Sequence, residues 1–260
     1  MTPLPNTDSM LLTRCLENTF ERFRRSARAA DDRLLVEKDG LLLIAADGLP
    51  WITNATVTRV PRDPTATLAR ASTFFAERAL GWGLKAAGEA AAAIAAAAEA
   101  AGLVPGERLP GMLLMPLAGE PPAVPDLEIR VVRDPRELAA FNATSATGFG
   151  GGEDQFALIY QPAVLDAPDS TLYLGYLEGA PVATAVRNTS HRIAGIGGVS
   201  TIPAARRRGI GEAITWRAAL DGVAEGCIAS FLESTEMGYS LYERMGYRRV
   251  IDFHTWEAPA

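Results

Sequence analysis

The hydrophobic and polar positions of the first 120 residues switch between a helical and a strand period. Apolar residues recur at helical spacing from Leu11 to Phe23, which predicts a helix that starts from a cap at Asp8-Ser9. Lys38-Asp39-Gly40 then joins two short apolar runs, as expected of a hairpin. The expected elements are a helix at 8–28, strands at 33–36, 41–45 and 51–60, a helix at 67–82 preceded by a cap at Asp63 or Thr65, and a strand at 112–117.

An alanine-rich tract at 85–102 interrupts this pattern. Alanine is the best helix former, and Gly102 is a typical residue to end a helix. Because the tract carries few charges to keep it in water, we expect a helix packed closely against a neighbour, with an exposed rigid linker as the alternative.

Proline is dense from 119 to 126, which favours a linker and a domain boundary there. Beyond it, Asp134-Pro135 is a cap followed by proline at the first helical position. A glycine-rich segment at 144–154 breaks the pattern. The expected elements are strands at 128–132, 172–177, 182–187, 192–201, 227–232 and 249–255, and helices at 135–141, 155–165, 207–222 and 237–245.

Composition narrows the class of protein. In the 260 residues, 48% are hydrophobic and 22% charged, which is typical of a soluble globular protein, and no apolar run approaches the roughly 20 residues that span a bilayer. The first residues lack an apolar signal core, so a cytoplasmic location is expected. The net charge is −6, most of it after Pro125, which argues against nucleic acid as a partner.

Cysteine and histidine offer no metal site. Cys15 and Cys227 are too few and too far apart for a disulfide framework or a zinc spacing, and they are expected to be reduced, packed thiols. His191 and His254 show no metal-ligand spacing, and a structural role is expected for each.

The clearest chemistry lies at 195–219, where an apolar strand meets a basic, glycine-spaced turn that opens a helix. The first turn of a helix leaves its N–H groups free and carries the positive end of the helix dipole, so this turn suits an anion. Gly209 and Gly211 let backbone approach a ligand closely, and three consecutive arginines add charge. A P-loop would need a Gly-Lys-Ser/Thr ending, and a Rossmann fingerprint would need glycine where Ser200 or Ile214 stands.

The pattern Arg206-x-x-Gly209-x-Gly211 resembles the acyl-CoA pyrophosphate loop of the GNAT superfamily of N-acetyltransferases. Residues 231–234 and the run Tyr242-x-x-x-Gly246-Tyr247 resemble that family's next strand and helix end, and 172–187 resembles its central hairpin. The resemblance spans about 128–256. It implies an α/β (α+β) fold, with a GNAT-like mixed sheet flanked by helices in a catalytic domain at 126–260. Residues 1–120 resemble a smaller, diverged GNAT-like domain of tandem members, on the order of elements alone.

The resemblance also implies site residues. Backbone groups of the strand end would pair with the pantetheine arm of the donor, and amides of the turn would hold its pyrophosphate. Tyr242 matches the family's tyrosine that protonates the leaving thiolate; the alternative is a core residue. Glu233, with Glu153 or Asp154 as alternatives, could order a water near the amine, and no general base is assigned. The implied donor-binding residues are Val199, Ser200, Thr201, Arg206, Arg207, Arg208, Gly209, Ile210, Gly211 and Glu212.

The resulting hypothesis is an N-acetyltransferase that moves an acetyl group from acetyl-CoA to a primary amine of a small molecule or peptide. The glycine-rich segment at 148–152 is expected to form the lip of the acceptor site. Two alternatives stay open: an acyl-CoA-binding sensor or scaffold without turnover, and a transferase for a longer acyl group. The identity of the acceptor and a homodimeric state also stay open.

Overall fold

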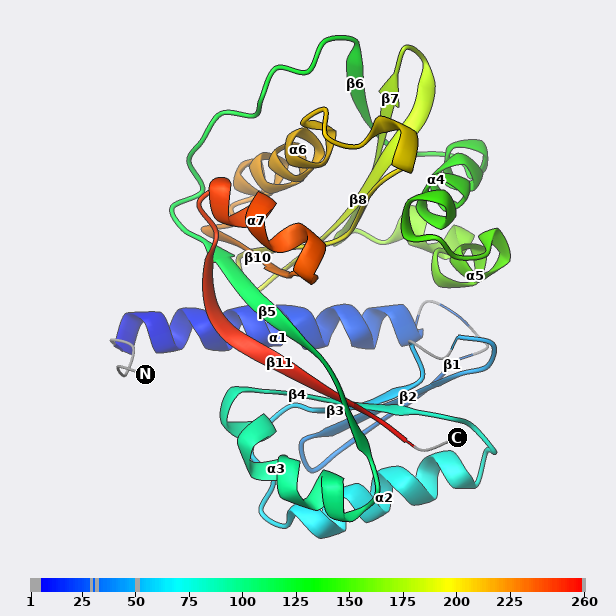
Figure 1. Cartoon of the computed structure of the whole chain (residues 1–260), viewed down its shortest axis with the longest axis vertical. Coiled ribbons are helices and arrows are strands. Elements are labelled where there is room, and N and C mark those ends of the chain that lie inside the picture. The colour runs from blue at the N-terminus through cyan, green and yellow to red at the C-terminus, as the bar shows by residue number, and fades with distance from the viewer. Residues whose placement is uncertain (1–5, 29, 31–32, 50–51, 259–260) are drawn as a thin grey trace. The chain divides into compact units, whose positions relative to one another are not determined.

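The computed structural model describes residues 6–28, 30, 33–49 and 52–258, with the side chains of 6–8 left out (Figure 1). The chain forms two compact units. The larger unit holds residues 1–22 and 112–250, and the smaller unit holds 23–111 and 251–260. Three elements have residues in both units: α1 (Asn6–Arg28), β5 (Val104–Leu114) and β11 (Arg248–Glu257).

The larger unit is built on a mixed sheet with the strand order β5-β10-β9-β8-β7-β6. Neighbouring strands from β6 to β9 run antiparallel, whereas β9 and β10 run parallel. The elements of this unit, besides the three shared ones, are β6 (Leu127–Val131), α4 (Pro135–Phe149), α5 (Glu153–Ile159), η1 (Pro162–Asp166), β7 (Ser170–Leu177), β8 (Ala180–Ser190), β9 (Ile193–Thr201), η2 (Pro203–Ala205), α6 (Ile210–Ala224), β10 (Ala229–Glu233) and α7 (Glu236–Arg244).

Helices cover both faces of this sheet. On one face, α6 packs its buried Ile210, Ile214 and Trp216 into a cluster with Tyr173 of β7 and Ile196 of β9. On the other face, Phe141 of α4 joins a cluster with Leu172, Leu174 and Val186. The alternation of side chains along the strands therefore separates an α6 side from an α4 side.

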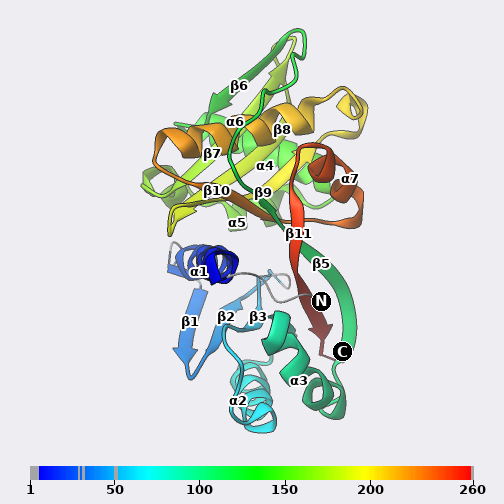
Figure 2. The same ribbon diagram turned by 90° about the vertical axis from the view of Figure 1, so that its left-hand side faces the viewer.

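The smaller unit has the strand order β1-β2-β3-β4-β11-β5, and two helices pack on its sheet (Figure 2). Asp63, one of the two predicted caps, caps α2 by accepting a hydrogen bond from the N–H of Ala66, and Pro64 stands at the first helical position. The alanine-rich α3 buries Ala90, Ala91, Ile94 and Ala98 against the sheet and α2, so the packed helix is confirmed. The elements are β1 (Arg33–Lys38), β2 (Leu41–Ala46), β3 (Asn54–Val57), α2 (Pro64–Ala76), β4 (Gly83–Ala87) and α3 (Gly88–Ala100).

Several boundaries differ from the sequence prediction. Helix α1 begins at Asn6, before the predicted cap, and α2 ends at Ala76. The third strand is the short β3, whose predicted start at Trp51 lies outside the described residues. The start of the alanine-rich tract is β4, because Gly83–Ala87 pairs with β3 and β11 and sheet pairing overrides helix propensity there.

The division of the chain also differs from a single cut between 120 and 126, which falls inside the larger unit. The last strand passes from one unit into the other, and Phe253–Glu257 pairs with β4 of the smaller unit. The first helix likewise contributes residues to both units. Such strand and helix sharing leaves no sequence signature comparable to a proline-rich linker.

Candidate functional site

The site predicted from the sequence lies where β9 parts from β10. The parallel ladder between these strands ends at the pair Leu232–Ile196, so the described ladder partners of the last residues of β9 are on β8 alone. The register between β8 and β9 shifts near Thr184, and Gly198 has a φ of +59°, a conformation that glycine adopts without strain. Thr184 Oγ1 donates to the Gly198 carbonyl over 2.9 Å, which fixes the bulge. One side of Val199, Ser200 and Thr201 is thereby left without a strand partner in the described sheet.

A basic turn follows directly. Arg207 has a φ of 61° and Gly209 a φ of 77°, so two left-handed residues reverse the chain before α6 begins at Ile210. Gly209 is the N-cap and has no side chain to bind the free N–H groups of the first turn. Arg206, Arg207, Arg208 and Gly209 are all exposed. The turn therefore presents unpaired backbone donors, the positive end of the helix dipole and the three arginine side chains at one place.

The second glycine of the turn leaves room beside the helix start. A Cβ added at Gly211 would lie 3.6 Å from Thr201 Oγ1 and 3.6 Å from Leu241 Cδ2, both ordinary contact distances. The end of β9, the start of α6 and α7 therefore meet at this turn. A pyrophosphate fits this donor set, because its oxygens can accept from the free N–H groups and from arginine.

Arg206 has a second role that the sequence did not predict. Its Nε donates to the Thr201 carbonyl over 3.1 Å, and its Nη2 donates to the Gly148 carbonyl over 2.8 Å. Gly148 lies in the last turn of α4, where a cation is favourable to the helix dipole. The side chain of Arg206 thus ties the end of α4 to the turn.

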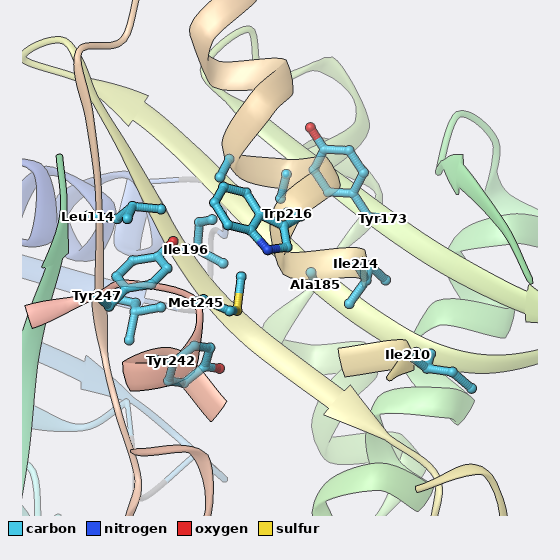
Figure 3. Close-up of a cluster of buried hydrophobic side chains, with 14 of the residues drawn as sticks. Leu114, Tyr173, Ala185, Ile196, Ile210, Ile214, Trp216, Tyr242, Met245 and Tyr247 are labelled. Atoms are coloured by element: carbon cyan, nitrogen blue, oxygen red, sulfur yellow. The ribbon is translucent and has the colours of Figure 1, made fainter. Parts of the chain in front are cut away.

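Tyr242 lies on α7, which starts from a Thr235 cap whose side chain accepts from the Gly238 N–H. The ring is buried and packs edge-to-face on Tyr247, with centroids 5.8 Å apart. Figure 3 shows it beside Met245 and Tyr247, with its hydroxyl turned away from Tyr247. Burial raises the pKa of Tyr242 to about 12, so its phenol is held in the protonated form. It is at once a core residue and a potential proton donor.

Glu233, the last residue of β10, is held by a residue that sequence reasoning missed. Arg22 of α1 donates from Nη2 to Glu233 Oε1 over 2.8 Å, and the Glu233 side chain is 10% exposed. The same guanidinium lies over β9, because a Cβ at Gly197 would be 2.8 Å from Arg22 Nη1. The carboxylate is therefore placed at the point where β9 and β10 separate.

Asn18, one turn earlier on α1, fastens the helix to the sheet. Its Nδ2 donates to the carbonyls of Asn188 and Ile193 over 3.0 and 3.1 Å, and to Ser190 Oγ over 2.9 Å. Gly195 makes room for it, because a Cβ there would lie 2.0 Å from Asn18 Oδ1. Asn18 and Arg22 are four residues apart and so lie on one face of α1, opposite Gly195 and Gly197, but no signal in the sequence links this face to that strand.

The glycine-rich segment at 148–152, expected to form the lip of the acceptor site, is partly helical. Residues 144–149 belong to α4, Gly150 is its left-handed C-cap, and Gly148 is buried against Ser200. Glu153 and Asp154 lie exposed in the first turn of α5. The residue that approaches the bulge is Tyr160, whose hydroxyl would lie 2.9 Å from a Cβ at Gly198. Tyr160, like Arg22, was not among the predicted site residues.

Among the described residues, no group of three or more His, Cys, Asp and Glu side chains has the geometry for a metal ion. Cys15 and Cys227 are both buried, free thiols. Among the described helices, none combines the length and apolar character needed to cross a membrane.

Comparison with known proteins shows which folds this chain resembles. Residues 164–250 match the family model of the acetyltransferase (GNAT) domain. No curated protein sequence matches the chain. The fold is similar to a GCN5-related N-acetyltransferase from Kribbella flavida, with a TM-score of 0.76, 22% identity and 95% of both chains covered.

Two further structures share the fold over nearly the whole chain. A tandem GNAT protein from the clavulanic acid biosynthesis pathway has a TM-score of 0.64 at 16% identity, covering 99% of this chain and 98% of the other. A GCN5-related N-acetyltransferase from Sphaerobacter thermophilus has a TM-score of 0.62 at 16% identity, covering 95% and 90%. The matched domain contains the β9–α6 turn and α7, and the chain as a whole has the mixed α/β fold of the GNAT superfamily of N-acetyltransferases.

Proposed function

We propose that the chain is an N-acetyltransferase that transfers an acetyl group from acetyl-CoA to a primary amine by direct attack. The observation that carries the proposal is the turn from Arg206 to Gly211, exposed from Arg206 to Gly209, with its uncapped helix start, directly after a strand edge left open by β10. A GNAT-type domain supports acyl transfer from an acyl-CoA in general. The acetyl donor and the amine acceptor are the specific part of the proposal.

The donor would be held at two places. Backbone groups of Val199, Ser200 and Thr201 would pair with the amides of the pantetheine arm, as an added strand would. The N–H groups from Arg207 to Glu212 would bind the pyrophosphate, with the arginine side chains adding charge. Arg206 would act partly through the protein, by keeping the end of α4 against the turn.

The acyl-CoA supplies an activated thioester. A neutral amine attacks the carbonyl carbon, the C–S bond breaks, and the thiolate must take up a proton. Tyr242 is the proposed donor of that proton, because a phenol is protonated at neutral pH and burial keeps this one so. Water then returns a proton to the phenolate. The proton lost by the amine passes to water.

The acceptor side would be formed by Glu233, Arg22 and Tyr160. The carboxylate of Glu233 can accept a hydrogen bond from the ammonium or from a water that removes its proton, while its ion pair with Arg22 fixes its orientation. The approach of Tyr160 to Gly198 puts a phenol next to the bulge. A cationic amine beside a carboxylate is favourable on this acidic protein.

The test is thiol release from acetyl-CoA in the presence of a panel of primary amines, with propionyl-CoA and butyryl-CoA as competing donors. Amine-dependent release of free CoA supports the transferase. Saturable acyl-CoA binding without thiol release on any amine would favour the sensor or scaffold, and preferential use of a longer thioester would change the donor.

A further inference from the structure

A polar cavity of about 500 Å³ lies in the larger unit, at the place where β6 ends and β7 begins. It is bounded by the C-terminal half of α6, by η1 and by β7 and β8. Val164 and Leu165 of η1 form an apolar wall. The polar walls are formed by Arg133, Thr171, Arg187, Arg217, Asp221 and Glu225. None of these residues belongs to the acyl-CoA site described above.

Arg187 is the unusual member of this wall, because a charged side chain is buried almost completely, at 3% exposure. Its Nη2 donates to Thr171 Oγ1 over 3.1 Å and to Glu225 Oε1. Its Nε and Nη1 have no acceptor among the described residues. A buried guanidinium with two unused donors costs free energy unless something supplies acceptors.

Tyr173 adds a third unused donor to the same cavity. Its side chain is fully buried, and its hydroxyl lies near the Asp221 carboxyl without making a hydrogen bond of ordinary geometry to any described residue. In Figure 3 the ring lies beside α6 and the hydroxyl points away from Ile210 and Ile214. Burial raises the pKa of Tyr173, so the hydroxyl stays a donor. Arg187 and Tyr173 are close, with the guanidinium carbon 5.9 Å from the ring centroid.

The missing partner must therefore provide acceptors, which an oxyanion does. The cavity favours a ligand with one negative charge over a ligand with two. Asp221 and Glu225 also line the cavity, and they would repel a phosphate dianion more strongly than a monoanion. Arg217 is already occupied, with its Nε 3.0 Å from Asp221, whereas Arg133 is exposed at the cavity. A carboxylate fits this balance of charge better than a phosphate does.

We propose that this cavity is a binding site for a small aliphatic carboxylate, separate from the acyl-CoA site. The carboxylate accepts hydrogen bonds from Arg187 and Tyr173, and the aliphatic chain lies against Val164 and Leu165. Glu225 is 48% exposed and yields its place on Arg187 to the ligand. The proposal does not depend on acyl transfer, because each group that it uses lies outside the β9–α6 turn.

The test uses the full-length, 15N-labelled chain and sodium butyrate as the probe. The Nε–H resonance of Arg187 is followed by NMR and identified by its loss in Arg187→Lys. We expect butyrate to shift it saturably, with a Kd in the millimolar range or tighter. Sodium phosphate and butylammonium chloride, at equal ionic strength, are expected to leave it in place.

Two variants test the donors without removing the buried cation. Tyr173→Phe keeps the ring and should weaken butyrate binding about tenfold, as expected for a lost hydrogen bond to a charged group. Arg133→Gln should weaken it less, by about threefold, through the lost charge. Arg136→Gln, an exposed arginine of α4, is the matched control and should bind as the wild type does. Thermal melts establish that each variant is folded.

Three results would overturn the proposal: no saturable shift with butyrate, an equal saturable shift with phosphate, or wild-type affinity in a folded Tyr173→Phe variant.

Discussion

Gly211→Asp is the most informative single change at the β9–α6 turn, because it separates ligand binding from folding. Gly211 is the second residue of α6, and a Cβ there meets Thr201 and Leu241 only at 3.6 Å. The new side chain therefore fits without a clash at its Cβ. An aspartate in the first turn also interacts favourably with the helix dipole, by about 0.3–1 kcal/mol. The variant should fold at least as stably as the wild type.

The same variant should bind acetyl-CoA more weakly, with a higher Kd. Like charges about 6 Å apart repel by about 1.4 kcal/mol per charge pair at an effective dielectric constant of about 40. A pyrophosphate with two charges then loses about 3 kcal/mol, which is about a 100-fold increase in Kd. Gly211→Asn is the matched control, because it has nearly the same shape without the charge.

The assay is titration calorimetry of both variants with acetyl-CoA, together with thermal melts. The ratio of the two Kd values should fall as salt is raised, because exposed charges are screened. Equal affinities of the Asp and Asn variants in low salt, with both proteins folded, would refute the placement of the pyrophosphate at this turn.

Three further predictions follow from the larger unit. Tyr242→Phe should lower kcat about 100-fold and leave the Kd for acetyl-CoA within about twofold. Because the pKa of Tyr242 is raised to about 12, kcat of the wild type should not fall with rising pH below about pH 10. Unchanged turnover of the variant in single-turnover kinetics would remove Tyr242 from the chemistry. Gly195→Ala should lower the free energy of unfolding by about 2–4 kcal/mol, because its Cβ would meet Asn18 Oδ1 at 2.0 Å. In urea denaturation, this loss should be smaller when Asn18→Ala is already present, and additive losses would contradict the contact. Burial raises the pKa of Cys15 from 9.0 to about 12, so its thiol should react with a disulfide reagent only when the chain unfolds. The stabilisation of the folded state from keeping this thiol neutral should be present below pH 9 and be lost as the pH rises toward 12. Rapid labelling of the native chain, with Cys15→Ala as the control, would contradict this.

Local signals predicted much of the fold. The Asp134 cap, with proline at the first helical position, occurs where the sequence placed it, and Asp63 is one of the two caps predicted for α2. The hairpin at Lys38-Asp39-Gly40 and the glycine-spaced turn before α6 also match, because turn geometry depends on the residues in the turn itself.

The features that the sequence did not predict all depend on distant partners. Gly83–Ala87 forms a strand because β3 and β11 pair with it, although its own residues favour a helix. Arg22 reaches Glu233 and Asn18 reaches Asn188 across more than 160 positions of the chain. In the sequence both look like ordinary polar residues of an amphipathic helix, and only the fold brings them to Gly195 and Gly197.

The proposed donor-binding residues, at 199–201 and 206–212, were predicted as a set because they lie in two neighbouring runs and their motif is local. Their contribution to binding stays a prediction. Of the proposed acceptor side, only Glu233 was predicted from the sequence. The proposal would combine α1, the end of β10 and Tyr160, and no short motif joins these segments.

The central claim is that the turn before α6 holds an acyl-CoA, and calorimetry of the wild-type chain with acetyl-CoA tests it most directly. Desulfo-CoA, which keeps the pyrophosphate, and ATP serve as controls. The account predicts saturable binding of acetyl-CoA near one site per chain, with desulfo-CoA competing for the same site. Absence of binding to the folded chain would contradict the account, because the glycine-arginine turn would then be no more than the start of a helix.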